Sequence, residues 1–168
     1  MPYVEGCCSP LYYTGDVRSS LLRYKFGGIN MYAGEYAKFL ARCIDENAFP
    51  CDSVAWVPLS RQRLRKRGYD QARLLAEETA KLLGLPCSSL LRKKRNNPAQ
   101  SGTGNAEKRR LNVKDVYEIR KYADISGKTV LLVDDIVTTG STLNECARVL
   151  KAAGAKAVYA GTLARRQD

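Results

Sequence analysis

Two adjacent carboxylates followed by a hydroxyl-rich loop form the segment of the sequence best suited to chemistry. Residues 130–142 read VLLVDDIVTTGST, so four aliphatic residues precede Asp134 and Asp135. The aliphatic run, 130–133, predicts a central strand of a parallel sheet, because it has no polar face to present to water. Ligands of open α/β sheets bind outside the carboxyl ends of the strands, which is where both acids are expected to lie.

The residues after the two acids predict a phosphate site. Thr138, Thr139, Gly140, Ser141 and Thr142 are expected to form a tight loop before a helix over 143–153. Free backbone N–H groups, hydroxyls and the positive end of the helix would then converge on one point. We therefore expect a phosphate dianion to bind at this loop.

This segment also resembles two other patterns. Four aliphatics and two acids also describe a Walker B strand, but the only Gly-Lys-Thr, at 127–129, has Tyr122 where a P-loop needs its first glycine. A plain strand, turn and capped helix would explain Ser141 and Thr142 without a ligand. It would not explain two adjacent acids leading into a TTG loop.

The pattern of apolar residues predicts helices and strands in alternation. Helices are expected over 12–26 and 31–44, and a third follows Asp70 as N-cap and ends at Gly84. Strands are expected over 53–59, 88–91, 116–119, 129–135 and 157–163, and segment 96–105 is expected to be a mobile loop. The alternation predicts an α/β fold with a central, mostly parallel sheet flanked by helices and a small N-terminal helical hood.

The length of 168 residues suits a single domain, 1–168, in which 1–50 form the helical hood and 51–168 the core. No apolar run approaches the ~20 residues that a membrane span requires. The N-terminus MPYVEGCC also lacks the layout of a signal peptide. The sequence therefore predicts a cytoplasmic protein.

Cysteine and histidine usage limits the chemistry. The six cysteines contain no C-x-x-C pair, so neither a zinc ribbon nor a disulfide framework is indicated and no metal-ligating residues are predicted. The chain contains no histidine. His-based acid–base catalysis, catalytic triads and imidazole metal sites are therefore excluded.

Positive charge is concentrated in the middle of the chain. Residues 61–110 contain fourteen Lys or Arg against four acids, while the whole chain carries a formal charge of +11. The clusters are 61–67, 92–95 and 108–110. Each could be an ordinary solvated face, but a pyrophosphate site needs only a few cations. The surplus suggests a larger polyanion such as nucleic acid.

The segment 130–142 resembles the phosphoribosyl pyrophosphate (PRPP) motif of type I phosphoribosyltransferases. Four segments in order resemble ComF-type competence proteins, which are phosphoribosyltransferase-like proteins of bacterial DNA uptake. These segments are YYTGDVRSSLLRYKFGG, VPLSRQRLRKRGYDQARLLA, NPAQSGTGNAEKRRLNV and VLLVDDIVTTGST. The resemblance covers roughly 10–165 and implies the type I phosphoribosyltransferase fold.

The resemblance also implies roles for individual residues. Asp134 and Asp135 would bind the ribose hydroxyls, and the loop 138–142 would hold the 5-phosphate. Leu59, Ser60 and Arg61 would face the pyrophosphate, with Arg67 and Gly68 supporting that loop. Segment 97–112 corresponds to the flexible catalytic loop, in which Gln100, Arg109 and Arg110 would close over the ligand. Asp134, Asp135, Arg109 and Arg110 are the residues expected to be catalytic.

Two departures from the family pattern qualify these expectations. Purine-salvage members carry an aspartate three residues after the second acid, where this chain has Thr138, so purine salvage is disfavoured. Many ComF-type relatives begin with a four-cysteine zinc ribbon, whereas this chain has only Cys7 and Cys8 near its start. Zinc is therefore not expected.

The expected function is PRPP or ribose 5-phosphate binding with Mg²⁺, in support of DNA uptake. Phosphoribosyl transfer would proceed by substitution at the sugar C1 with pyrophosphate as leaving group. Two alternatives stay open: a non-enzymatic module that senses the sugar phosphate or binds single-stranded DNA and a competence helicase, and a small-molecule salvage enzyme. A homodimer is among the assemblies that the sequence leaves open.

Overall fold

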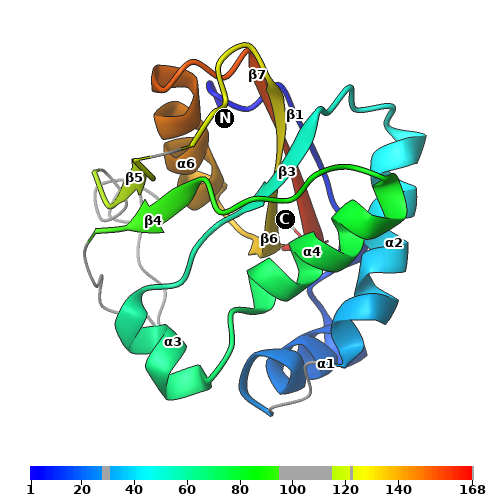
Figure 1. The fold of residues 1–168 in the computed structure, drawn as a ribbon. Coiled ribbons are helices and arrows are strands. Elements are labelled where there is room, and N and C mark those ends of the chain that lie inside the picture. Colours follow the sequence, from blue (N-terminus) through cyan, green and yellow to red (C-terminus); the bar gives the residue numbers. More distant parts are fainter. Residues whose placement is uncertain (28–30, 95–114, 122, 168) are drawn as a thin grey trace.

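The computed structural model describes residues 1–27, 31–94, 115–121 and 123–167, in which strands and helices alternate (Figure 1). In chain order the elements are β1 (Gly6–Cys8), β2 (Leu11–Tyr12), α1 (Gly15–Phe26), α2 (Tyr32–Glu46), β3 (Ser53–Trp56), α3 (Arg61–Arg67), α4 (Gln71–Leu83), β4 (Leu91–Lys93), β5 (Tyr117–Ile119), β6 (Thr129–Val137), α6 (Ser141–Ala152) and β7 (Ala157–Arg165). The loop predicted over 96–105 lies outside the described residues.

The main sheet is parallel, which confirms the predicted fold class. Its strand order is β1-β7-β6-β3, and β2 pairs with the far end of β7. The strand β6 lies in the middle, with Val130 to Val133 paired to β3 on one side and to β7 on the other. All four of these aliphatic residues are fully buried, as the run without a polar face predicts.

Helices cover both faces of the sheet. Helices α2 and α4 pack against each other and over the face to which Leu131 and Val133 point. Helix α6 packs on the opposite face against Val130 and Leu132 (Figure 1). The alternation of side chains along β6 therefore divides the core into two layers.

The helix predicted after Asp70 is confirmed, including both of its ends. The Asp70 side chain accepts a hydrogen bond from the Arg73 backbone N–H, at 3.2 Å. Gly84 closes the helix in the left-handed region, with φ of 67°. Between these caps the predicted apolar residues Ala72 and Leu75 are buried against the sheet.

The segment after β3 differs from the prediction. The strand expected over 53–59 ends at Trp56, and the helix α3 (Arg61–Arg67) was not predicted. Ser60 begins this helix, since its Oγ accepts from the Arg63 N–H at 3.4 Å, and Gly68 ends it at φ of 86°. Helix α3 contains five cations and no buried residue, so its sequence shows no apolar periodicity that would predict a helix.

Two further predictions require correction. Strands β4 and β5 do not join the main sheet but form a separate antiparallel pair. The first twelve residues contribute β1 and β2 to the edge of the main sheet, whereas a helix was expected from Tyr12. The hood assignment for 1–50 omitted these strands, which are too short to show a recognisable period.

Among the helices of the described residues, none combines the length and the apolar character needed to cross a membrane.

Candidate functional site

The two acids lie where strand β3 ends and β6 continues alone. Pairing with β3 stops at Val133, whereas pairing with β7 continues to Val137. Asp134 and Asp135 are therefore inside β6 rather than in a loop beyond it. In open α/β sheets ligands bind in the crevice outside such strand ends, and helix α3 follows β3 at this edge.

Asp134 and Asp135 point to opposite faces of the sheet. Side chains alternate along a strand, so Asp135 shares the α2/α4 face with Leu131 and Val133. Asp134 shares the α6 face, and the electrostatic neighbours that face it there are Lys93, Tyr117 and Cys146. The pair therefore offers two different carboxylate environments.

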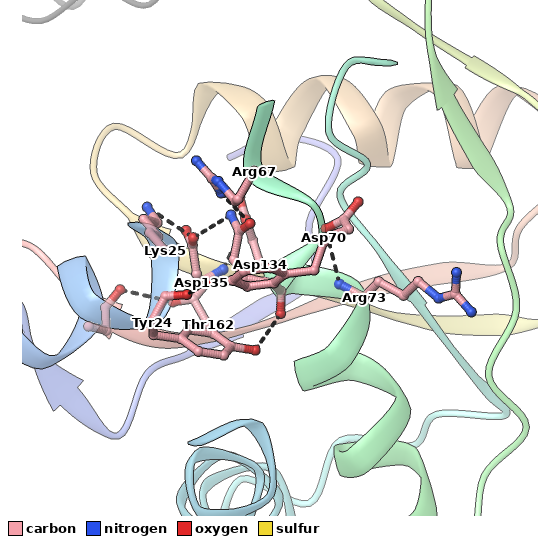
Figure 2. A network of polar contacts seen from close by, with 11 residues as sticks. Tyr24, Lys25, Arg67, Asp70, Arg73, Asp134, Asp135 and Thr162 are labelled. Carbon is pink, nitrogen blue, oxygen red and sulfur yellow. Dashed lines mark hydrogen bonds and ion pairs between the residues drawn. The ribbon is translucent and has the colours of Figure 1, made fainter. Parts of the chain in front are cut away.

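Asp135 is buried and held by two donors on the same oxygen. The Lys25 ammonium, from the last turn of α1, lies 2.9 Å from Asp135 Oδ2. Gln71 Nε2, from the start of α4, donates to that Oδ2 at 2.8 Å. Figure 2 shows Lys25 and Asp135 joined at the end of β6. Lys25 and Gln71, which precede Asp135 by 110 and 64 positions in the sequence, thus both contact one carboxylate.

A set of contacts fastens the end of α1 to the junction between α3 and α4. The Tyr24 hydroxyl donates to the Gln71 carbonyl at 2.8 Å, and the Tyr69 hydroxyl donates to the Tyr24 carbonyl. The Arg67 guanidinium donates to the Gln71 side-chain oxygen and lies over the Phe26 ring, 4.9 Å from its centroid. The position of Lys25 is consequently fixed by its neighbours on both sides.

Asp134, unlike Asp135, has no cation in direct contact with its carboxylate among the described residues. Its Oδ1 accepts the Asp135 backbone N–H at 2.9 Å. Burial and the adjacent Asp135 carboxylate raise the pKa of Asp134 well above its usual range, while Lys25 opposes this rise. A cationic ligand or a ligand-borne cation would relieve this imbalance.

The predicted phosphate loop is shorter than expected. Helix α6 begins at Ser141 rather than at 143, so Ser141 and Thr142 lie in its first turn. Thr138 and Thr139 are exposed, and Thr139 Oγ1 lies 2.9 Å from Ser141 Oγ. The N–H groups of the first helical turn have no intrahelical acceptor, so they and these hydroxyls can bind an anion.

Gly140 makes the tight turn between strand and helix possible. Its φ is 70°, in the left-handed region that glycine adopts without steric cost. A Cβ at this position would come within 2.4 Å of the Met1 Sδ. The turn therefore requires glycine for its backbone conformation, whereas the flexible Met1 side chain could move aside.

The three residues predicted to face the pyrophosphate lie around the start of α3. The Leu59 N–H donates to Asp70 Oδ2 at 3.1 Å, so this amide links the crevice rim to the cap of α4. Ser60 is 4% exposed and its Oγ is used in capping. Arg61 is exposed at the first position of α3.

Arg67 lies within the network around Asp135, whereas Gln100, Arg109 and Arg110 lie outside the described residues. Lys25 and Gln71 were missed by sequence reasoning. Gln71 directly follows a capping aspartate, which gave it a purely local explanation. Lys25 belongs to the YKFGG end of α1, and nothing in its surroundings along the chain indicates a distant carboxylate.

A cationic groove follows the end of β3, lined by residues from Trp56 onward. Its volume is about 1150 Å³ and it runs between α3, α4 and the β4–β5 pair. The cations that line it are Arg61, Arg73, Arg92, Lys93, Lys94 and Arg120. Three acids, Asp70, Glu77 and Glu118, share the lining, and Glu118 forms ion pairs with Arg92 and Lys94.

A solved structure shares this fold. Glutamine PRPP amidotransferase from B. subtilis, complexed with ADP and GMP, superposes with a TM-score of 0.53 at 24% identity. The match covers 78% of this chain and 26% of that one. The likeness at this level of identity shows the fold.

The family model described as phosphoribosyl transferase domain matches residues 70–168, which include both acids and the phosphate loop. The chain belongs to this family, as the resemblance of the segment 130–142 implied. Within the family it is of the ComF type.

Curated relatives carry the ComF-type resemblance. Competence protein F of Haemophilus influenzae is 33% identical over 116 residues, covering 68% of this chain and 50% of that protein. Competence protein ComFC of Streptococcus pneumoniae is 32% identical over 153 residues, covering 91% and 65%. DNA utilization protein YhgH of Escherichia coli is 32% identical over 114 residues, covering 68% and 49%. The chain thus spans between half and two thirds of these relatives' length.

Proposed function

We propose that this protein binds PRPP or ribose 5-phosphate, with the 5-phosphate at the start of α6 and the ribose beside the acids of β6. One observation carries the proposal. Asp134 and Asp135 are separated by two residues from a hydroxyl-bearing turn that opens a helix, at the point where β3 stops pairing. A sugar phosphate has the hydroxyls and the dianion that these two groups would bind.

The reaction open to such a site is substitution at the ribose C1. Pyrophosphate would leave as the C1–O bond breaks, and an acceptor nucleophile would form the new bond. Positive charge develops on the sugar as the bond breaks, and the fixed carboxylate of Asp134 would stabilise it. Catalysis would rest on positioning and electrostatics, and the acceptor would supply the nucleophile.

The acidic pair also fits Mg²⁺ that accompanies PRPP. Carboxylate oxygens are the hard ligands that Mg²⁺ prefers, and Asp134 lacks an ion-pair partner among the described residues. Mg²⁺ would neutralise charge on the pyrophosphate. Asp134 is the residue of this chain placed to hold it, directly or through water.

Calorimetry with PRPP and Mg²⁺ tests the proposal. We expect the double variant Asp134→Asn/Asp135→Asn to lose at least about 30-fold in affinity, because two charged hydrogen-bond acceptors are removed. The matched control is Asp45→Asn/Asp124→Asn, two aspartates distant from the crevice in α2 and in the turn before β6. Equal affinity of wild type and the double variant would overturn the ribose assignment.

A role in DNA uptake is supported by the cationic groove. Its walls bring together cations from α3, α4 and the β4–β5 pair, three elements distant in sequence. A phosphate backbone would displace counterions from such a surface, so binding would be tolerant of sequence and would weaken steeply with salt. We propose single-stranded DNA as the polyanion, and a competence helicase as the partner that delivers or receives it.

Two measurements separate this reading from the alternatives. Release of pyrophosphate from PRPP in the presence of candidate acceptors would identify an enzyme, and binding without release would identify a sensor. Absence of DNA binding at low salt would favour a small-molecule salvage enzyme, in which the groove cations serve another anion.

A further inference from the structure

Lys25 makes a long-range ion pair with an acid of the proposed ribose site. Its Nζ lies 2.9 Å from Asp135 Oδ2, and the side chains of Lys25 and Asp135 are 20% and 6% exposed (Figure 2). A carboxylate this well buried is costly unless it is paired and hydrogen-bonded. Lys25 and Gln71 together satisfy one of its oxygens, Oδ2.

The contact is built into the fold rather than made by a free surface side chain. Tyr24, next to Lys25, is completely buried and donates its hydroxyl to the Gln71 carbonyl. Phe26, on the other side, lies under the Arg67 guanidinium. The last turn of α1 is thus held against the helices that border the crevice. The backbone at Lys25 cannot move far without breaking these contacts.

We propose that Lys25 is a positioning residue, which through its ion pair with Asp135 holds the two acids of β6 in alignment for a ribose phosphate. This inference rests on the proposed PRPP site and extends it to a residue of α1. Lys25 acts here through Asp135 and does not touch the ligand. Its loss should therefore matter only while Asp135 is present.

The charged and titratable groups around the acids come from several elements. Lys25 and Tyr24 belong to α1, and Asp70 precedes α4. Arg67 reaches the site through Gln71. On the α6 face, the groups are Lys93, Tyr117 and Cys146. Among them Lys25 is the cation in direct contact with Asp135, and it opposes the rise in the pKa of Asp134.

The test measures PRPP affinity, with Mg²⁺, for Lys25→Met between pH 5 and pH 8. Methionine retains the aliphatic stem and removes the charge. We expect affinity at pH 7 to fall by about 10- to 100-fold, as for a hydrogen bond to a charged group. The loss should persist across this pH range, because it reflects the missing contact with Asp135. Lys25→Arg should recover most of the affinity.

Two controls separate this role from general damage. Lys38→Met removes an exposed α2 lysine paired with Glu35 and should change neither the affinity nor its pH profile. In an Asp135→Asn background, which removes the buried charge and protects folding, Lys25→Met should cost no further affinity. An equal loss in both backgrounds would mean that Lys25 contacts the ligand itself, and would overturn the proposal.

The remaining outcomes distinguish this inference from the proposed function. If wild type binds PRPP and Lys25→Met matches it at every pH, the inference fails and the PRPP site stands. If wild type does not bind PRPP, the site proposal fails. A double-mutant cycle of Lys25→Met and Asp135→Asn, measured by urea denaturation, then still tests the ion pair, and a coupling free energy of zero would refute it.

Discussion

Gln71 and Asp135 are joined by a 2.8 Å hydrogen bond from Gln71 Nε2 to Asp135 Oδ2. The other end of the same amide accepts from Arg67, so its orientation is determined by both partners. The first residue of α4 therefore connects the basic helix α3 to an acid of β6. Substitution of Arg67, Gln71 or Asp135 should therefore alter the hydrogen bonding of the other two side chains.

Replacing Gln71 by glutamate should destabilise the protein at neutral pH. The new carboxylate would face Asp135 at hydrogen-bond distance without a proton to donate, so we expect a loss of about 1 to 3 kcal/mol in the free energy of unfolding. Urea denaturation at pH 7 measures it, with Gln62→Glu on the exposed face of α3 as control. Equal midpoints for the two variants would show that the Gln71 contact contributes nothing.

Asp134→Asn should stabilise the unliganded protein while weakening PRPP binding. Folding raises the pKa of Asp134, so the folded protein is most stable when this carboxyl is protonated. Its contribution to the free energy of unfolding is complete below about pH 4 and is lost as pH rises through the folded-state pKa. Asparagine stays neutral and can still accept the Asp135 N–H. We expect a gain of about 1 kcal/mol at pH 7 that vanishes near pH 3. Thermal unfolding at both pH values checks the sign.

Gly140→Ala should weaken both folding and phosphate binding. An alanine in the left-handed region costs about 1 to 2 kcal/mol, and its Cβ would collide with Met1. Gly34→Ala in the first turn of α2 is the matched control, because nothing lies within 4 Å of a Cβ there and φ is not positive. That variant should be neutral or slightly stabilising. A fully stable Gly140→Ala would show that the turn can rearrange.

Glu118→Gln should strengthen DNA binding at low salt. Glu118 pairs with Arg92 and Lys94 in the groove, and its neutralisation would free both cations for phosphate contacts. The slope of log affinity against log salt should then steepen by up to about 2 units. Neutralising Arg92, Lys93 and Lys94 together should flatten it by up to about 3 units. Fluorescence anisotropy with labelled single-stranded DNA measures both, and Glu35→Gln on α2 is the control.

How far the sequence predicts the structure depends on the range of the interactions. The aliphatic run of β6, the cap at Asp70 and the glycine stop at Gly84 depend on neighbouring residues, and all three are confirmed. Helix α3 has local caps too, but its cations gave no apolar period. Only the capping residues Ser60 and Gly68 could have predicted where this helix begins and ends.

The part of the site that the sequence did not reveal is held by distant partners. Lys25 reaches Asp135 across 110 positions, and Gln71 reaches it across 64. A lysine near a helix C-terminus has an adequate local explanation in the helix dipole, so nothing marks it as a partner of a buried acid. Only the packing of α1 against α4 and β6 brings these groups together.

The β4–β5 pair brings two distant points of the chain together. The Lys94 N–H donates to the Val116 carbonyl at 2.8 Å. Asp115 beside it adopts a positive φ of 57°, and its N–H is bound by Glu145 of α6. The two ends of the intervening segment are thus anchored independently of its sequence. Glu145 of α6 therefore helps to set where the chain enters β5, and a change at Glu145 should shift the start of that strand.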